Sequence, residues 1–299
     1  MAELPAPTIT VRSTEIIDSA IAHVRRTRAA LGFLDPESGE SYGTRSYYIR
    51  AIIERFIANN SAIVWTGLAA ISYALKGQIL AQSALSLATI DSRVEVCIDQ
   101  QARAVITART RLAIIGRHAR LEKEAAVALN NSGFIAASIS LQNRAALAAV
   151  SSTNRAIADL QAVTDTNTTI METLHLHVED LNAQVMSTGI PENLSTGGSG
   201  LLDVNAASLR LSSQQLKERS RDFALEHRSA ISENTPVKVA RTHGQHFTAA
   251  FDSLLARFEY NQNILLLRIG TRISELAEGL ANAAATLTES DIAAASVLH

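Results

Sequence analysis

Apolar residues recur at three- and four-residue steps along two long stretches of the chain. The stripe in residues 167–185 consists of Asn167, Met171, Leu174, Val178, Leu181 and Val185. The stripe in residues 247–280 has one polar member, Gln262, and otherwise consists of Phe247, Phe251, Leu254, Phe258, Leu265, Ile269, Ile273, Leu276 and Leu280. This spacing places the members of each stripe on one side of an α-helix. We therefore expect amphipathic helices over about 134–186 and 246–285, with Asn167 as a residue that could fix helix register.

Helix-start and loop-forming residues divide the rest of the chain. Ser13, Thr14 and Glu15 favour a helix start, as do Asp91 and Ser92. Further helices are expected over about 14–31, 45–57, 62–90, 91–129 and 203–231. Residues rich in Gly, Pro, Ser and Asn predict loops at 32–43, 130–133 and 232–244. The Gly-rich segment 189–200 is the predicted linker between an N-terminal helical region, residues 1–188, and a C-terminal helical region, residues 201–299.

The composition agrees with a helical protein. Aromatic residues make up 4% of the 299 residues, and there are only 14 Gly and 5 Pro, whereas Ala, Leu and Ile are abundant. We expect an all-α fold, an elongated multi-helix bundle with long amphipathic helices and one Gly-rich linker. A hydrophobic content of 47% excludes a disordered chain. Cys97 is the one cysteine, so the fold is expected not to depend on a disulfide or on an oxidising compartment.

An apolar segment spans residues 56–90, in which Lys76 is the only charged residue. Polar residues at 59–61 leave a clean apolar run of about fifteen residues, short of the roughly twenty that a membrane span needs. We expect a buried core hairpin hinged near Lys76 and Gly77, in preference to a membrane-inserting one. Trp65-Thr66-Gly67 resembles the Trp-x-Gly turn of small secreted helical-hairpin proteins. The N-terminus lacks the pattern of a secretory signal, which favours an intracellular or virion location.

The net charge of −2 hides two segments of opposite charge. Residues 156–209 contain seven acids and no Lys or Arg. Residues 100–121 contain no acid, and their arginines would occupy one arc of a basic amphipathic helix opposite an apolar face. These arginines are Arg103, Arg109, Arg111, Arg117 and Arg120.

Three explanations of this charge segregation stay open. The basic and acidic helices could neutralise each other, within one subunit or between neighbours. The arginine arc, together with Arg25, Arg26 and Arg28, could follow a nucleic-acid backbone without regard to base sequence. A basic amphipathic helix also suits an anionic membrane surface.

The string Arg241-Thr242-His243-Gly244-Gln245 follows Thr235-Pro236 and resembles a segment of the fumarase and adenylosuccinate lyase superfamily. The resemblance covers at most about residues 195–270, and it implies acid–base or substrate-binding work for His243. The later Ser-Ser-x-Met-Pro-x-Lys-x-Asn loop of that superfamily has no counterpart in this chain. The protein would then be a divergent relative or a fragment of these enzymes.

Other reaction centres find little support in the sequence. His243 and His246 have one further ligand nearby, Asp252, whereas zinc sites usually use three or four protein ligands. No glycine-rich phosphate loop and no Gly-x-Ser-x-Gly string is present. We therefore expect no metal, no cofactor and no catalytic residue.

The sequence thus favours an interaction protein over an enzyme. The leading hypothesis is a self-associating α-helical structural protein of the coat or nucleocapsid type, whose partners are further copies of itself and an RNA or DNA backbone. The nucleic-acid contacts are assigned to Arg103, Arg109, Arg111, Arg117, Arg120, Arg25, Arg26 and Arg28. A helical membrane-active or pore-forming protein and a lyase relative are the alternatives.

Overall fold

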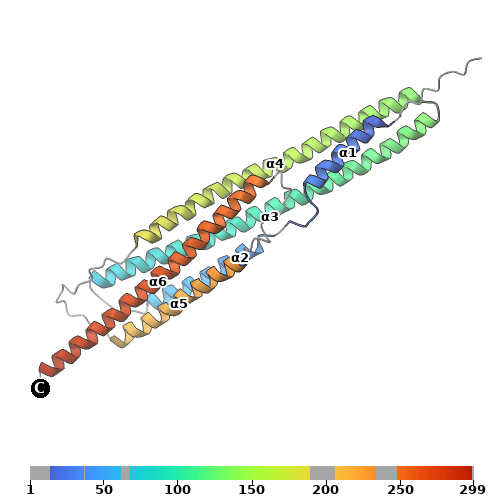
Figure 1. The fold of residues 1–299 in the computed structure, drawn as a ribbon. Coiled ribbons are helices and arrows are strands. Elements are labelled where there is room, and N and C mark those ends of the chain that lie inside the picture. Colours follow the sequence, from blue (N-terminus) through green and yellow to red (C-terminus); the bar gives the residue numbers. More distant parts are fainter. Residues whose placement is uncertain (1–13, 37, 62–67, 189–205, 234–247, 298–299) are drawn as a thin grey trace, which may run out of the picture. The chain divides into compact units, whose positions relative to one another are not determined.

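A computed structural model describes residues 14–36, 38–61, 68–188, 206–233 and 248–297. The described residues form helices and contain no strand, which confirms the predicted all-α, multi-helix fold (Figure 1). The helices are α1 (Glu15–Ala30), α2 (Glu40–Ser61), α3 (Leu68–Asn131), α4 (Ile135–Ser187), α5 (Ala206–Glu233) and α6 (Ala249–Val297).

The chain divides into two compact units. Among the described residues, the first unit contains 14–36, 100–167 and 248–251, and the second contains the remainder. Helices α3 and α4 therefore contribute residues to both units. The predicted linker at 189–200 lies outside the described residues, so the domain boundary expected there stays a prediction.

In the first unit, α1 packs against α3 and α4 (Figure 1). Its buried side chains meet an alanine-rich surface, which lets helices approach closely. The core cluster is Ile17, Ala20, Ile21, Val24, Leu31, Val105, Ala108, Leu112, Ala119, Ala145, Ala146, Ala149, Ala156 and Leu160. Helix α1 runs antiparallel to α3, because Lys123 contacts Asp18 near one end of α1 and Arg109 contacts Leu31 at the other.

The turn between α3 and α4 falls where the sequence predicts a loop. Gly133 has φ +84°, a left-handed conformation that glycine adopts without a steric penalty. The backbone N–H of Phe134 donates to the carbonyl of Leu129 at 2.9 Å and satisfies a terminal helix carbonyl. Ser138 then donates to the carbonyl of Ala126 at 2.7 Å, joining the two antiparallel helices.

In the second unit, the predicted stripe of α6 forms part of the core. Phe258, Leu265, Ile269, Ile273, Leu276 and Leu280 are buried, and so is Gln262. Helices α5 and α6 approach closely at Gly270, whose carbonyl accepts a hydrogen bond from Ser220 at 2.9 Å. A Cβ at position 270 would lie 3.2 Å from the Cβ of Phe223, so glycine allows this approach.

The hinge expected at Lys76 and Gly77 is wrong, because α3 continues through both residues. A single glycine costs a helix interior only about 1 kcal/mol, which packing offsets. The hairpin is instead formed by α2 and α3, whose antiparallel order follows from the bonds of Ser46 to Ala88 and of Gly39 to Asp99. Residues 62–67 between these helices, which include the Trp-x-Gly string, lie outside the described residues.

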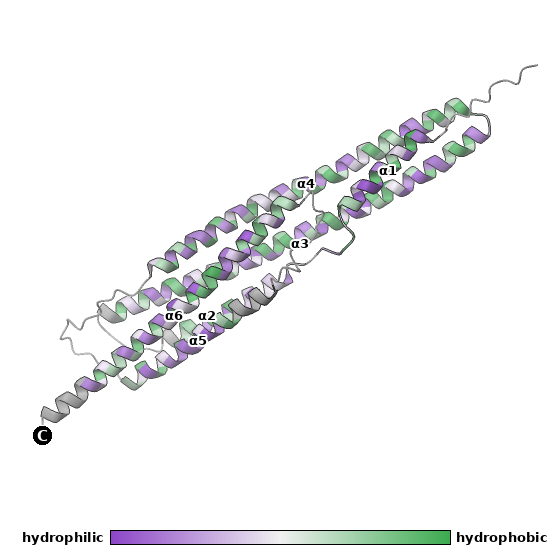
Figure 2. Ribbon diagram, viewed as in Figure 1, coloured by the Kyte–Doolittle hydropathy of each residue, from purple (hydrophilic) through white to green (hydrophobic). Residues whose placement is uncertain are grey.

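The apolar segment is also less buried than expected. Ile71 is 65% exposed and Leu75 is 56% exposed. Figure 2 shows apolar and polar positions mixed along the ribbon of α3. No described helix is long and apolar enough to cross a membrane.

Candidate functional site

The arginines of the basic helix do not act as one surface. Arg109 lies at the end of α1, where its Nε donates to the carbonyl of Leu31 at 3.1 Å and its Nη1 donates to the carbonyl of Leu34 at 2.6 Å. These carbonyls follow the last turn of α1 and have no partner within that helix. Partial burial lowers the pKa of the Arg109 guanidinium. Arg109 therefore closes the C-terminal end of α1.

Two further arginines of α3 have partners within the protein. Arg111 forms an ion pair with Asp159 of α4, and both side chains are about half exposed. Arg120 donates from Nε to the carbonyl of Gly116 on its own helix at 3.0 Å. The pair of Arg111 and Asp159 is one instance of the predicted neutralisation between the basic and acidic segments.

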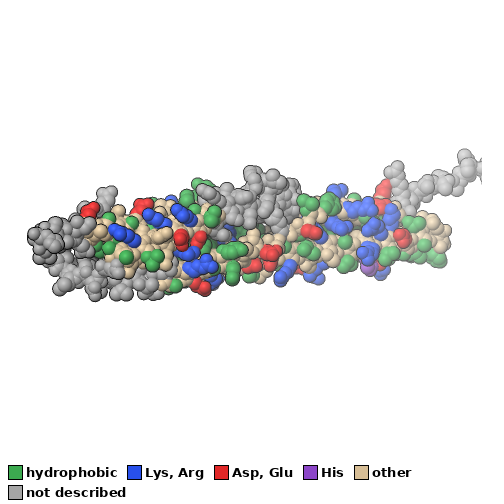
Figure 3. All heavy atoms as spheres, turned by 90° about the horizontal axis from the view of Figure 1, so that it is seen from below, with side chains coloured by type: hydrophobic (Ala, Val, Ile, Leu, Met, Phe, Trp, Pro, Cys, Tyr) green, Lys and Arg blue, Asp and Glu red, His purple; other side chains and the backbone are tan. Residues whose placement is uncertain are grey.

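The remaining predicted arginines face solvent. Arg103 and Arg117 of α3 are exposed and form no hydrogen bond or ion pair with the described residues. Arg25, Arg26 and Arg28 of α1 are exposed as well. Figure 3 shows Lys and Arg side chains gathered over the part of the first unit that contains α1. A phosphate backbone could therefore be contacted by these five, whereas Arg109 is already bound to backbone carbonyls.

A groove of about 570 Å³ lies between α3 and α4 in the first unit. Small apolar side chains form its floor, and exposed polar and charged side chains form its rim. Its lining consists of Gln100, Arg103, Ala104, Thr107, Ala108, Arg111, Ala156, Asp159, Leu160, Ala162, Val163, Thr166 and Asn167. The groove is large enough to accept several side chains of a partner.

A buried hydrogen-bond network links α3 and α4 at one end of this groove. Asn167 donates from Nδ2 to Oε1 of Gln101 at 3.2 Å, and Gln101 donates from Nε2 to Oγ1 of Thr164 at 2.9 Å. Asn167 is fully buried, as its place in the apolar stripe indicates. Because these amides must stay paired in the core, the network fixes how α3 and α4 align.

An acidic surface follows on the second-unit part of α4. Glu172, Leu176 and Asp180 are spaced four residues apart and therefore lie on one side of the helix. All three are exposed, and Leu176 is 59% exposed. Neither Glu172 nor Asp180 forms a hydrogen bond or ion pair with the described residues, whereas Glu179 accepts a bond from Asn261 at 3.2 Å.

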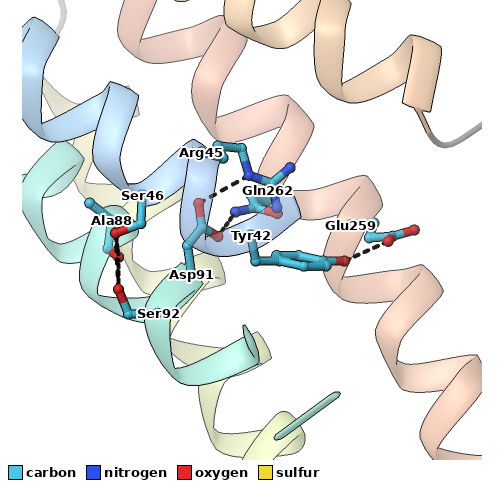
Figure 4. A network of polar contacts seen from close by, with 8 residues as sticks. All are labelled: Tyr42, Arg45, Ser46, Ala88, Asp91, Ser92, Glu259 and Gln262. Atoms are coloured by element: carbon cyan, nitrogen blue, oxygen red, sulfur yellow. Dashed lines mark hydrogen bonds and ion pairs between the residues drawn. The ribbon is translucent and has the colours of Figure 1, made fainter. Parts of the chain in front are cut away.

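Sequence reasoning missed a buried polar network in the second unit (Figure 4). Arg45 of α2 donates from Nε to Oδ2 of Asp91 at 3.0 Å, and Gln262 of α6 donates to the other carboxylate oxygen. Nearby, the hydroxyl of Tyr42 donates to Glu259, and the guanidinium of Arg45 lies 4.6 Å from the centre of the Tyr42 ring.

The expected helix cap at Asp91 is therefore wrong, because α3 continues through this residue. The signal that could have revealed its role is its spacing. Asp91 follows Leu87 by four residues and precedes Val94 by three, so it lies on the buried side of the helix. Burial raises the pKa of the Asp91 carboxyl to about 6, although Arg45 and Gln262 oppose the rise.

This network ties α2, α3 and α6 together in the interior of the second unit. Asp91 is 0% exposed and Arg45 is 7% exposed. In the part of the chain that the structure describes, no group of three or more His, Cys, Asp or Glu could hold a metal ion. The lyase-like string at 241–245, with His243, and His246 lie outside that part.

A model of the EspA/EspE family matches residues 31–114. The match covers less than a third of the chain and extends from the end of α1 through α2 into α3. It includes Arg45 and Asp91, and it includes the α3 side of the groove but not the α4 side. No curated protein and no solved structure matches the chain.

Proposed function

We propose that this protein is a self-associating α-helical structural protein of the coat type, whose copies bind one another through exposed surfaces. The observation that carries the proposal is the exposure of large apolar side chains around the α3–α4 turn. Leu121 is 59% exposed, Phe134 is 62% exposed and Leu147 is 73% exposed. Ile135 is 48% exposed and Ile139 is 41% exposed, so that with Phe134 three large apolar side chains are exposed at the start of α4. Neighbouring exposed apolar side chains are typical of interaction surfaces, whereas single exposed leucines are ordinary.

Sedimentation velocity over a range of protein concentrations tests this proposal. The purified chain should sediment as an oligomer, and negative-stain micrographs should show regular assemblies. Changing Phe134→Ser together with Leu147→Ser should shift the distribution toward the monomer. Leu211→Ser is the matched control, because Leu211 is 58% exposed but belongs to α5 in the second unit. A chain that stays monomeric at every concentration contradicts the proposal.

A second candidate function is binding to a nucleic-acid backbone, as a nucleocapsid protein requires. It is supported by Arg25, Arg26 and Arg28, which are exposed on two turns of α1. Arg28 lies close enough to Arg109 that its charge also lowers the pKa of that guanidinium. Cations held this close together attract phosphate without base specificity.

Titration with an RNA of mixed sequence at several salt concentrations tests the second function. Changing Arg25→Gln and Arg28→Gln should weaken binding to unrelated sequences equally and reduce the salt dependence by about one charge for each arginine. If the salt dependence of binding is unchanged, these arginines do not contact phosphate, and the second function is contradicted.

A further inference from the structure

We propose that the groove between α3 and α4 of one copy receives the acidic side of α4, Glu172 to Asp180, from a second copy. The inference rests on the proposed function, because it names a contact through which the copies associate. It is carried by the shape and charge of two surfaces on the same chain.

The groove suits a helix as its occupant. Its floor is formed by Ala104, Ala108 and Ala156, with Leu160 and Val163 beside them. Alanines at a helix–helix contact allow backbones to approach closely, so a side chain of a third helix can reach the floor. On the incoming helix, Leu176 is the large apolar residue between the two acids.

The charges of the two surfaces are complementary. Arg103 stands on the α3 rim without a partner among the described residues, and Arg111 beside it is only half buried in its pair with Asp159. Helix α3 has no acid between residues 100 and 121, and α4 has no Lys or Arg from residue 156 to its end at Ser187. Docking therefore brings Glu172 and Asp180 of one copy close to Arg103 and Arg111 of the other. Each of the two acids then gains a cationic partner.

The occupant has to come from another molecule. The α4 wall of the groove ends at Asn167, and Glu172 lies five residues further along the same helix. Because α4 is continuous from Ile135 to Ser187, its later turns cannot fold back into a groove that its earlier turns form. The contact joins two different surfaces of the chain, so it either occurs twice in a two-fold dimer or continues head to tail into a ring or an open filament.

Disulfide cross-linking between two variants tests the docking directly. Thr107→Cys places a thiol in the groove, and Leu176→Cys places one on the acidic side of α4. After the two variants are mixed and oxidised, a covalent dimer of one chain of each should form. Thr107→Cys mixed with Leu211→Cys is the matched control, because Leu211 is 58% exposed and belongs to α5, outside both surfaces. The natural Cys97 is 2% exposed and stays buried in all three variants.

The outcomes distinguish the inference from the proposed function. Absence of a dimer above the control level, in a protein that still sediments as an oligomer, overturns the docking and leaves self-association intact. Absence of both the dimer and the oligomer contradicts both. A dimer that forms between the Thr107→Cys and Leu176→Cys variants, and not in the control, supports the docking.

Charge reversal supplies a second test. Arg103→Glu and Asp180→Arg should each weaken association about tenfold, and the two variants mixed together should recover part of the loss. Arg26→Glu, an exposed arginine of α1, is the control and should leave association unchanged. If Arg103→Glu abolishes RNA binding but leaves sedimentation unchanged, the groove binds a phosphate backbone and the docking is overturned.

Discussion

Nε of Arg45 donates to Oδ2 of Asp91 at 3.0 Å, in the core of the second unit, where neither side chain reaches solvent to a substantial degree. A buried ion pair is weak evidence of stability in itself, because removing two charges from water costs about as much as their attraction returns. Its effect is on specificity. The pair forms only when α2 and α3 are correctly aligned, so sliding either helix would leave a buried charge without a partner.

Removing the cation from this pair should destabilise the second unit strongly. Arg45→Ala leaves Asp91 buried with only Gln262 as a partner, and the expected loss is about 3–5 kcal/mol in the free energy of unfolding. Urea denaturation followed by circular dichroism measures this loss. Arg50→Ala is the control, since Arg50 is exposed and bonds Thr89 at 3.3 Å, and it should change stability by about 0.5 kcal/mol or less.

The Asp91 carboxyl should give the second unit a pH-dependent stability. Burial raises its pKa from 3.8 to about 6, so the folded protein binds this proton more tightly than the unfolded chain does. The resulting contribution is fully present below about pH 4 and is lost as the pH rises through 6. Its size is on the order of 3 kcal/mol. Comparing urea unfolding of the natural chain and of Asp91→Asn between pH 4 and 7 measures it, and equal slopes in both proteins would contradict the assignment.

Two glycines of α6 should respond differently to the same substitution. A Cβ at Gly270 would press on Phe223 at 3.2 Å, whereas a Cβ at Gly279 meets nothing within 4 Å. Gly279→Ala should therefore stabilise the protein by about 0.5–1 kcal/mol through helix propensity. Gly270→Ala should stabilise the protein less than Gly279→Ala does, or destabilise it, because α5 has to move away from the added methyl group. Thermal unfolding of the two variants side by side decides the matter, and equal gains would show that α5 and α6 are not in close contact.

The sequence correctly predicts the all-α fold and the described part of the α6 stripe, because period and composition are local properties. It misplaces the hinge at Lys76 and Gly77 because long-range packing, which is absent from a local pattern, decides whether a glycine interrupts a helix. The helix cap predicted at Asp91 is wrong for a similar reason. Arg45 and Gln262, the partners of Asp91, lie 46 and 171 residues away in the chain, and no local pattern connects them.

The roles of the arginines on α3 cannot be read from a local pattern either. On a single helix, Arg103, Arg109 and Arg111 appear equivalent, since all lie on one polar arc. Neighbouring helices distinguish them. Arg109 bonds carbonyls at the end of α1, Arg111 pairs with Asp159 on α4, and Arg103 forms no hydrogen bond or ion pair with the described residues. Only the tertiary arrangement separates structural arginines from those available to a partner.

That separation leads to a prediction that compares two arginines of the same helix. Arg109→Gln should lower the free energy of unfolding by about 1–3 kcal/mol, because the carbonyls of Leu31 and Leu34 lose a charged donor. Arg109→Lys should lose much of the same stability, since an ammonium group cannot replace the fork of donors. Arg117→Gln, at an exposed site, should leave thermal unfolding nearly unchanged.

The same variants should behave in the opposite way in an RNA titration. Arg117→Gln should reduce the salt dependence of binding by about one charge, and Arg109→Gln, measured at a temperature where it is folded, should leave it unchanged. If both variants reduce the salt dependence equally, Arg109 releases its carbonyls to bind phosphate, and its assignment as the closing residue of α1 is wrong. If neither reduces it, any nucleic-acid contact of the chain lies away from this helix.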